Sequence, residues 1–246
     1  MASHIPQRCC LSGSLHVGDP TGEMEQIESF RAYIARPKAG AKPGTAVILL
    51  SDIFGIFHNN QLLADEFARN GYLAILPDLF EGDQITVDDY DTKKVDMPTW
   101  ISRHTVEDVS PIVEATIQYA RAQPGIQHIA AAGYCLGAKY VVRSLKGGRI
   151  DSGYIAHPSF VTDEELAPLK GPLSISAAEH DPIFTTAKRH SSEETLRGAG
   201  QAFQINLFSG VAHGFASRGD LSQHHVRFAK EQAFAQAVAW FGHTLQ

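Results

Sequence analysis

Long apolar runs are scarce in this sequence of 246 residues. The longest strongly apolar stretch, from Thr45 to Ser51, is much shorter than the roughly 20 residues that a membrane-spanning helix needs. The opening residues MASHIPQRCC lack both the basic cluster and the apolar core of a secretory signal. We therefore expect a cytoplasmic protein that does not enter a membrane.

The sequence also has fewer positively charged than negatively charged residues. Lysine and arginine together number 21 against 27 aspartates and glutamates, which gives a formal net charge of −6. The chain contains no basic run interleaved with aromatic residues, as a nucleic-acid-binding surface requires. A small molecule is therefore the expected partner and nucleic acid is not, while the sequence leaves the oligomeric state open.

Cysteine is rare, and its placement excludes a disulfide framework. The three cysteines are an adjacent pair, Cys9 and Cys10, and the distant Cys135. The pair has no further ligands at metal-binding spacing nearby. The acidic run at Asp88–Asp91 lacks the glycine and the bidentate glutamate of a calcium loop, and we interpret it as a solvated loop. We therefore expect free thiols, no metal and no cofactor.

The sequence does contain enough apolar residues, 43 %, to form a full core, and residues 1–246 are expected to form one α/β domain. Short apolar runs alternate with longer helical segments, as in a doubly wound, mostly parallel sheet with helices on both faces. The predicted strands are 28–35, 46–50, 72–76, 128–132, 153–156, 173–176 and 203–208. The predicted helices are 59–70, 106–123, 136–146, 185–197 and 224–243.

Turn residues mark the ends of several of these segments. Gly71 and Gly198 are predicted to end the helices that precede them. The proline- and glycine-rich segment from Arg36 to Gly44 is predicted to be a hairpin or crossover loop within the domain. Ligands of a doubly wound sheet bind beyond the carboxyl ends of its strands. Functional residues are therefore expected directly after each apolar run.

One strand end carries the run Gly133-Tyr134-Cys135-Leu136-Gly137. A Gly-x-Cys-x-Gly run is the nucleophile-elbow pattern of α/β-hydrolases with cysteine in place of serine. Its glycines allow neighbouring backbone to approach a sharp strand-to-helix turn. The turn puts the thiol at a helix N-terminus, which favours the thiolate, and the Leu136 N–H can point at a developing oxyanion. The pattern by itself is also compatible with a packed core thiol.

An acid and a base follow this pattern at later strand ends. Asp181 comes after the apolar run 173–176, and His213 comes after the run 203–208. The order nucleophile, acid, base is the order found in α/β-hydrolases. His213 is predicted to accept the thiol proton, and Asp181 to orient and stabilise its ring. Because the three residue types occur together in this order, the sequence predicts a Cys–His–Asp triad.

The sequence resembles the dienelactone hydrolases, or carboxymethylenebutenolidases, over nearly its whole length. The resemblance rests on the cysteine elbow and on four further runs, and the N-terminal segments from Cys9 and from His16 resemble the fungal branch. The four runs are Asp52-Ile53-Phe54-Gly55, Pro77-Asp78-Leu79, His180-Asp181-Pro182 and His213-Gly214-Phe215-Ala216. The resemblance implies a compact α/β-hydrolase with this triad and no large lid.

The resemblance also implies roles around the triad. The N–H groups of Ile53 and Leu136 would form the oxyanion hole. Asp52 stands where the family usually has a glutamate that holds the resting thiol, and is one methylene shorter. Arg218 matches, one residue late, an arginine that binds the substrate carboxylate. The family's second such arginine follows Pro-Asp-Leu, where this chain has Phe80.

His157 also follows an apolar run, and it is either a substrate contact or part of a strand-ending turn. Taken together, these residues predict a cofactor-independent hydrolase of a small ester or lactone that works through a thioester acyl-enzyme. Acyl transfer to an alcohol would use the same chemistry. A non-catalytic binding or interaction protein on a hydrolase scaffold is the alternative from another class.

Overall fold

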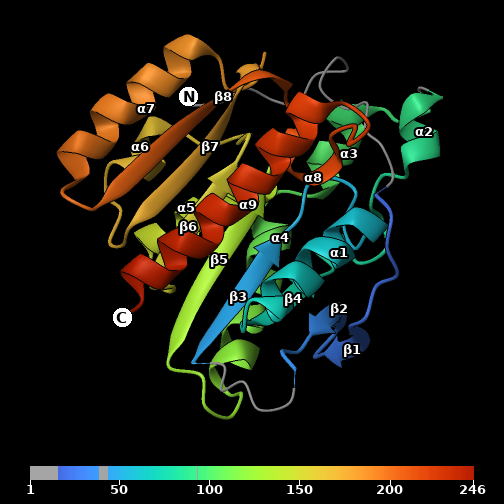
Figure 1. Ribbon diagram of the computed structural model, residues 1–246. Helices are drawn as coiled ribbons and strands as arrows, with labels where there is room; N and C mark the ends of the chain where they lie inside the picture. The colour runs from blue at the N-terminus through green and yellow to red at the C-terminus, as the bar shows by residue number, and fades with distance from the viewer. Residues whose placement is uncertain (1–15, 39–43, 93) are drawn as a thin grey trace.

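The computed structural model describes residues 16–38, 44–92 and 94–246, and the eight strands in these ranges form one sheet (Figure 1). The strand order is β1-β2-β4-β3-β5-β6-β7-β8. The β1–β2 and β2–β4 pairs are antiparallel, and every other pair is parallel. The predicted α/β architecture with a mostly parallel sheet is therefore confirmed.

The strands are β1 Glu23–Ile27, β2 Phe30–Ala35, β3 Thr45–Leu50, β4 Leu73–Pro77, β5 His128–Tyr134, β6 Ser152–Ala156, β7 Leu173–His180 and β8 Phe203–Ala212. The helices are α1 His58–Arg69, α2 Val87–Asp91, α3 Met97–Arg103, α4 Val106–Arg121, α5 Gly137–Lys146, α6 Asp163–Leu166, α7 Thr186–Ala199, α8 Phe215–Arg218 and α9 His224–Thr244.

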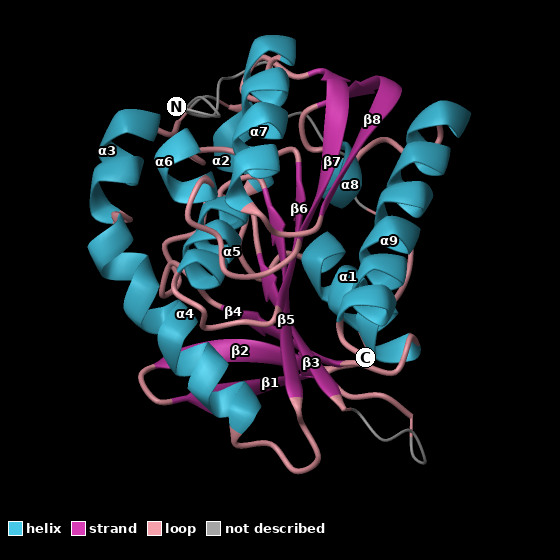
Figure 2. Cartoon of the chain, turned by 90° about the vertical axis from the view of Figure 1, so that its left-hand side faces the viewer, coloured by secondary structure: helices cyan, strands magenta, loops and turns pink. Residues whose placement is uncertain are grey.

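Helices cover both faces of the sheet (Figure 2). Helices α4, α5 and α7 lie on one face, and α1 and α9 lie on the other. Along β3, Ile48 and Leu50 pack into the first layer, whereas Val47 and Leu49 pack into the second. A strand buried on both faces has no polar side, and this explains why the sequences of the central strands are continuous apolar runs.

The first sheet edge differs from the prediction. The strand predicted from Glu28 begins at Phe30, because Glu28 has a φ of 49° in the turn that joins β2 to the unpredicted strand β1. In the sheet β4 lies between β2 and β3, so the predicted loop after Arg36 is a crossover and not a hairpin. Residues 39–43 of that loop, like Cys9 and Cys10, lie outside the described residues.

Two other predictions were wrong. The acidic run from Asp88 to Asp91 lies in helix α2, whose first turn is capped by the Thr86 side chain accepting a hydrogen bond from the Asp89 N–H. Helix α7 passes through Gly198 and ends before Gly200, which has the left-handed φ of 72° that a helix-ending glycine adopts.

Within the described ranges, no helix combines the length and apolarity needed to cross a membrane.

The turn from β5 to α5 is packed against the end of β3. A Cβ atom added to Gly137 would lie 2.0 Å from the carbonyl oxygen of Leu50, and one added to Gly133 would lie 2.7 Å from the carbonyl oxygen of Gly137. The Gly137 N–H also donates to the Ser51 carbonyl at 3.0 Å. Any side chain at position 137 would therefore push the two strand ends apart.

We expect Gly137→Ala to lower the free energy of unfolding by about 3 kcal/mol or more, because the added methyl group overpacks against backbone that cannot move aside. Urea titration followed by circular dichroism measures this change. Gly198→Ala is the matched control in a helix, since its added Cβ meets no atom within 4 Å. The control should raise stability by about 0.5–1 kcal/mol. Equal stability of the two variants would contradict the packing argument.

Candidate active site

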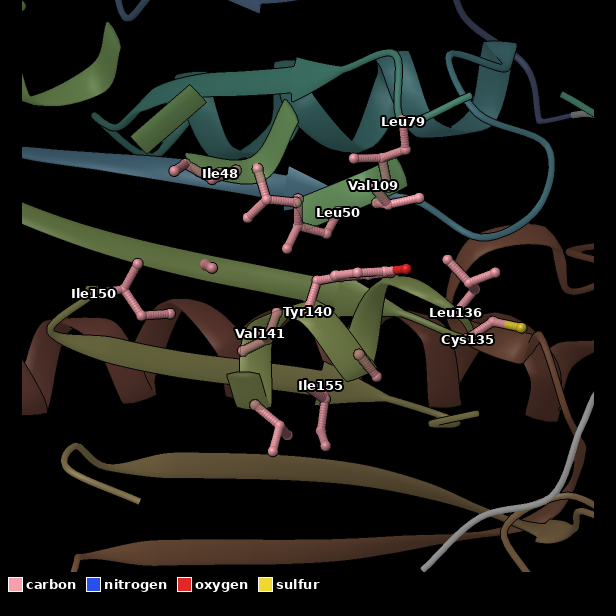
Figure 3. Close-up of a cluster of buried hydrophobic side chains, with 14 of the residues drawn as sticks. Ile48, Leu50, Leu79, Val109, Cys135, Leu136, Tyr140, Val141, Ile150 and Ile155 are labelled. Atoms are coloured by element: carbon pink, nitrogen blue, oxygen red, sulfur yellow. The ribbon is translucent and has the colours of Figure 1, made fainter. Parts of the chain in front are cut away.

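Cys135 lies on the turn between β5 and α5 in a strained conformation. Its φ is 52°, in the left-handed region that non-glycine residues rarely adopt. The side chain is fully buried, and Figure 3 shows Cys135 and Leu136 beyond the end of β5, at one end of the apolar cluster. Strain of this kind persists only where the surroundings enforce it, and it is concentrated at functional sites. The geometry agrees with the predicted elbow.

The Cys135 sulfur lies 3.2 Å from the hydroxyl oxygen of Ser159. Ser159 follows β6, is fully buried, and donates its backbone N–H to the Cys135 carbonyl at 2.9 Å. The sequence analysis missed this residue. Its only signal was its place two residues after His157 at a strand end, and serine is too common in turns for that signal to stand out.

His213 and Asp181 form a buried hydrogen-bonded pair. The distance from His213 Nδ1 to Asp181 Oδ2 is 2.9 Å, and both side chains are shielded from solvent. The other carboxylate oxygen accepts the N–H groups of Ile183 at 2.8 Å and Phe184 at 2.9 Å. The loop after β7 thus fixes the carboxylate, and the carboxylate in turn fixes the ring of His213.

This pairing shifts the pKa values of both groups. Burial by itself lowers the pKa of His213, but the negative charges of Cys135 and Asp181 raise it to about 9. Burial raises the pKa of Asp181, yet the hydrogen bond and the charge of His213 outweigh it and hold the value below its usual range. Cys135 raises the pKa of this ring by its charge and by hydrogen bonding, although the resting geometry gives His213 Nε2 no well-formed hydrogen bond among the described residues. The pair therefore favours an imidazolium beside a carboxylate.

The two predicted oxyanion donors come from the loop after β3 and from the β5–α5 turn. Ile53 is fully buried in the loop after β3, and Leu136 precedes α5. That loop contains Gly55, with a φ of 61°, whose N–H donates to the Asp52 carbonyl at 3.1 Å. Within the described part of the chain, neither the Ile53 nor the Leu136 N–H donates to another protein group. Both groups therefore remain available to a ligand oxygen.

Asp52 and Arg218 form a buried ion pair. Arg218 Nη1 lies 2.6 Å from Asp52 Oδ2, and both side chains are almost fully shielded from solvent. Asp52 also accepts hydrogen bonds from Ser217 at 3.0 Å and from Asn60 at 3.2 Å. The Arg218 guanidinium lies 5.3 Å from the centre of the Phe54 ring. The structure thus places the predicted thiol holder and the predicted carboxylate binder against each other, and the thiol lies against Ser159.

His157 is fully buried against the predicted base. Its ring centre lies 4.9 Å from that of His213, with the two planes at 67°. Burial lowers the pKa of His157 well below 6.5, and the charges of His213 and Arg218 lower it further. His157 is therefore a neutral ring that packs behind His213, and it also forms the predicted strand-ending turn. A substrate contact by this residue remains a prediction.

The described residues contain no group of three or more histidine, cysteine, aspartate or glutamate side chains arranged to hold a metal ion. The arrangement of Cys135, His213 and Asp181 provides a sulfur, a ring that can take up and release a proton, and a buried carboxylate. These groups suit nucleophilic attack on an acyl carbon.

Comparison with known proteins places the chain among the dienelactone hydrolases. A family model described as "Dienelactone hydrolase family" matches residues 30–245. The protein named Hydrolase pyvD, from Aspergillus violaceofuscus, is 44% identical over 100% of both chains. Dienlactone hydrolase 1 from Gibberella moniliformis is 33% identical over 94% of this chain and 91% of its own.

The fold of this chain resembles that of a solved structure. The crystal structure of a putative dienelactone hydrolase from Klebsiella pneumoniae superposes with a TM-score of 0.77, covering 90% of this chain and 98% of that one. The two sequences are 21% identical, so this likeness bears on the fold alone.

We expect the His213 ring to titrate near pH 9, which histidine-selective NMR measures directly. Because this pKa exceeds the ordinary value of 6.5, protonation of His213 stabilises the fold fully below pH 6.5, and that contribution is lost as the pH rises through about 9. Cys135→Ala should lower the pKa of His213, since it removes a neighbouring negative charge. A ring that titrates at 6.5 or below in the unmodified protein would contradict the proposed charge arrangement.

Proposed function

The chain belongs to the dienelactone hydrolase family and is a hydrolase, and we propose that it cleaves small esters or lactones with Cys135 as the nucleophile. His213 is the proton-transfer group, and Asp181 orients it. The observation that carries this proposal is the buried Asp181–His213 pair beside a cysteine in a strained turn. A buried ion pair and a strained thiol are costly features that a purely structural site would not require.

Acylation begins with the thiolate of Cys135 and the imidazolium of His213. The raised pKa of His213, about 9, supports this charge state at neutral pH. Sulfur attacks the carbonyl carbon, a C–S bond forms, and the π electrons of the carbonyl move onto oxygen. The N–H groups of Ile53 and Leu136 would stabilise that oxyanion. The intermediate then collapses, the C–O bond to the leaving group breaks, and His213 donates its proton to the alkoxide.

Deacylation returns the enzyme to its starting state. A water molecule gives a proton to the now neutral His213 as its oxygen attacks the thioester carbonyl. The tetrahedral intermediate expels the Cys135 thiolate, and the acid product leaves. Asp181 accepts a hydrogen bond from Nδ1 throughout, so the opposite nitrogen of His213 carries the proton in each step.

The surroundings of Arg218 favour substrates without a carboxylate. Its guanidinium pairs with Asp52 at 2.6 Å and lies on the Phe54 ring. Phe80, at the position where the resemblance would place a second arginine, is buried against Trp100. A substrate carboxylate at this place would have to compete with Asp52 for Arg218, and like charges in a buried site repel strongly. The substrate class is therefore an uncharged ester or lactone.

We expect Cys135→Ala to lower the rate of 4-nitrophenyl acetate hydrolysis at least about a thousand-fold, as the loss of a nucleophile does in other triad enzymes. Intact-mass measurement during turnover should detect one acetyl group on the wild-type chain and none on the variant. Lys188→Ala is a control at a lysine of α7 outside the proposed triad. Unchanged hydrolysis in Cys135→Ala would refute the covalent mechanism.

A second test compares two acyl groups of similar length. We expect kcat/KM for 4-nitrophenyl butyrate to exceed that for 4-nitrophenyl hemisuccinate at least about tenfold, because the second ester brings a carboxylate toward Asp52. Asp52→Asn removes the competing charge and should narrow this ratio. A wild-type preference for the charged ester that disappears in Arg218→Gln would show instead that Arg218 binds substrate carboxylates.

A further inference from the structure

Several residues with strained backbone conformations lie around the predicted nucleophile. Among the described residues, five that are not glycine have a positive φ, and three of these lie at one place. They are Cys135 with 52°, His157 with 37° and Phe160 with 60°. The last two bracket the turn that follows β6 and contains Ser159. Such conformations are costly and are kept where a side chain must be held in an exact position.

Three separate contacts fix this turn. The His157 N–H donates to the Ser176 carbonyl on β7 at 2.9 Å, and the Ser159 N–H donates to the Cys135 carbonyl at 2.9 Å. Lys139 of α5 donates to the Phe160 carbonyl at 3.1 Å. Its ammonium group also pairs with Glu165 of α6 at 2.9 Å. The turn is therefore tied to the sheet, to the cysteine itself and to two helices.

The result of this placement is a hydroxyl group directed at the sulfur. Ser159 Oγ lies 3.2 Å from Cys135 Sγ, and both side chains are fully buried. His213 Nε2 makes no well-formed hydrogen bond with any described residue. The Ser159 hydroxyl is thus the hydrogen-bond partner that this structure gives to the sulfur, and the sulfur also raises the pKa of the His213 ring.

We propose that Ser159 is a further catalytic residue, whose hydroxyl donates a hydrogen bond to the Cys135 thiolate and holds it in the resting position until an acyl group arrives. This inference rests on the proposed function, since it needs Cys135 to be the nucleophile. A thiolate has no proton to give, so in that state the hydroxyl is the donor.

The hydrogen bond from Ser159 to the sulfur is lost during acylation and forms again during deacylation. On attack, a sulfur lone pair forms the C–S bond, and the Ser159 hydroxyl keeps its proton and loses its acceptor. On deacylation, the C–S bond breaks with its electron pair on sulfur, and the hydroxyl again donates to the departing thiolate. Ser159 therefore stabilises the leaving group of the second step and transfers no proton itself.

A neutral donor suits this site better than a carboxylate. Asp52 could repel a thiolate but could not donate to it, and its oxygens already accept from Arg218, Ser217 and Asn60. The other titratable or charged groups around the sulfur and its partner ring come from separate elements. They are His213 after β8, Asp181 after β7, His157 after β6, Asp52 after β3 and Arg218 in α8.

The test is the pH dependence of the alkylation of Cys135 by iodoacetamide, read by mass spectrometry of the peptide that contains it, so that Cys9 and Cys10 do not contribute. Loss of a hydrogen bond to a charged sulfur should raise the midpoint of this profile by about one pH unit in Ser159→Ala. Ser192→Ala is the matched control, a fully buried serine on α7 whose hydroxyl has no partner among the described residues. The control should leave the midpoint unchanged.

An unchanged or lowered midpoint in Ser159→Ala would overturn the assignment of Ser159. Equal upward shifts in both serine variants would do the same, because they would reflect a general effect of losing a buried hydroxyl. Failure of the proposed function looks different. In that case the protein would keep its esterase activity after complete alkylation of Cys135, whatever the midpoint in the serine variants.

Discussion

The close contact between Gly137 and the end of β3 is the constraint on which the site depends. There is no room for a Cβ at position 137, because it would lie 2.0 Å from the Leu50 carbonyl oxygen. The contact brings the β5–α5 turn against the loop that contains Ile53. The β5–α5 turn, which carries Cys135 and Leu136, meets the strand end that leads to Ile53 only because no side chain stands between the two backbones. The strained φ of Cys135 belongs to the same close turn.

The second constraint is electrostatic. The site buries two carboxylates, and each has its own cationic partner. Asp181 pairs with His213 at 2.9 Å, and Asp52 pairs with Arg218 at 2.6 Å. Burial makes an unpaired charge expensive, so each pair depends on both of its members. In the proposed mechanism, this division leaves the thiolate with the imidazolium as its balancing charge and Ser159 as its hydrogen-bond donor.

The sequence predicted the central architecture well, because its physical signals are local. Continuous apolar runs such as the one in β3 and the glycines around Cys135 follow directly from burial and close packing. Short elements were harder, since helix α2 depends on one capping threonine and β1 on a turn at Glu28. The order of the predicted triad residues could be taken from the chain, whereas the position of Ser159 beside Cys135 could not. That position comes from a turn held by α5, α6 and β7, and no short sequence pattern records such a tertiary contact.

The pairing of Asp52 with Arg218 could not be predicted from the sequence for the same reason. Each was recognisable as a charged residue at the expected place, but their separation of 2.6 Å is a property of the folded chain. Family resemblance suggested one role for each residue separately. The fold places them together, and under the proposed function this changes the chemistry that the site offers to a substrate.

The most direct test of the central claim is the chemical nature of the bond between enzyme and acyl group. Wild-type protein turning over an ester with a ¹³C-labelled carbonyl is quenched in acid, and the denatured chain is studied by ¹³C NMR. We predict a protein-bound resonance at the chemical shift of a thioester, absent in Cys135→Ala. An oxygen-ester resonance, or no protein-bound carbonyl while product forms at the normal rate, would contradict a cysteine nucleophile.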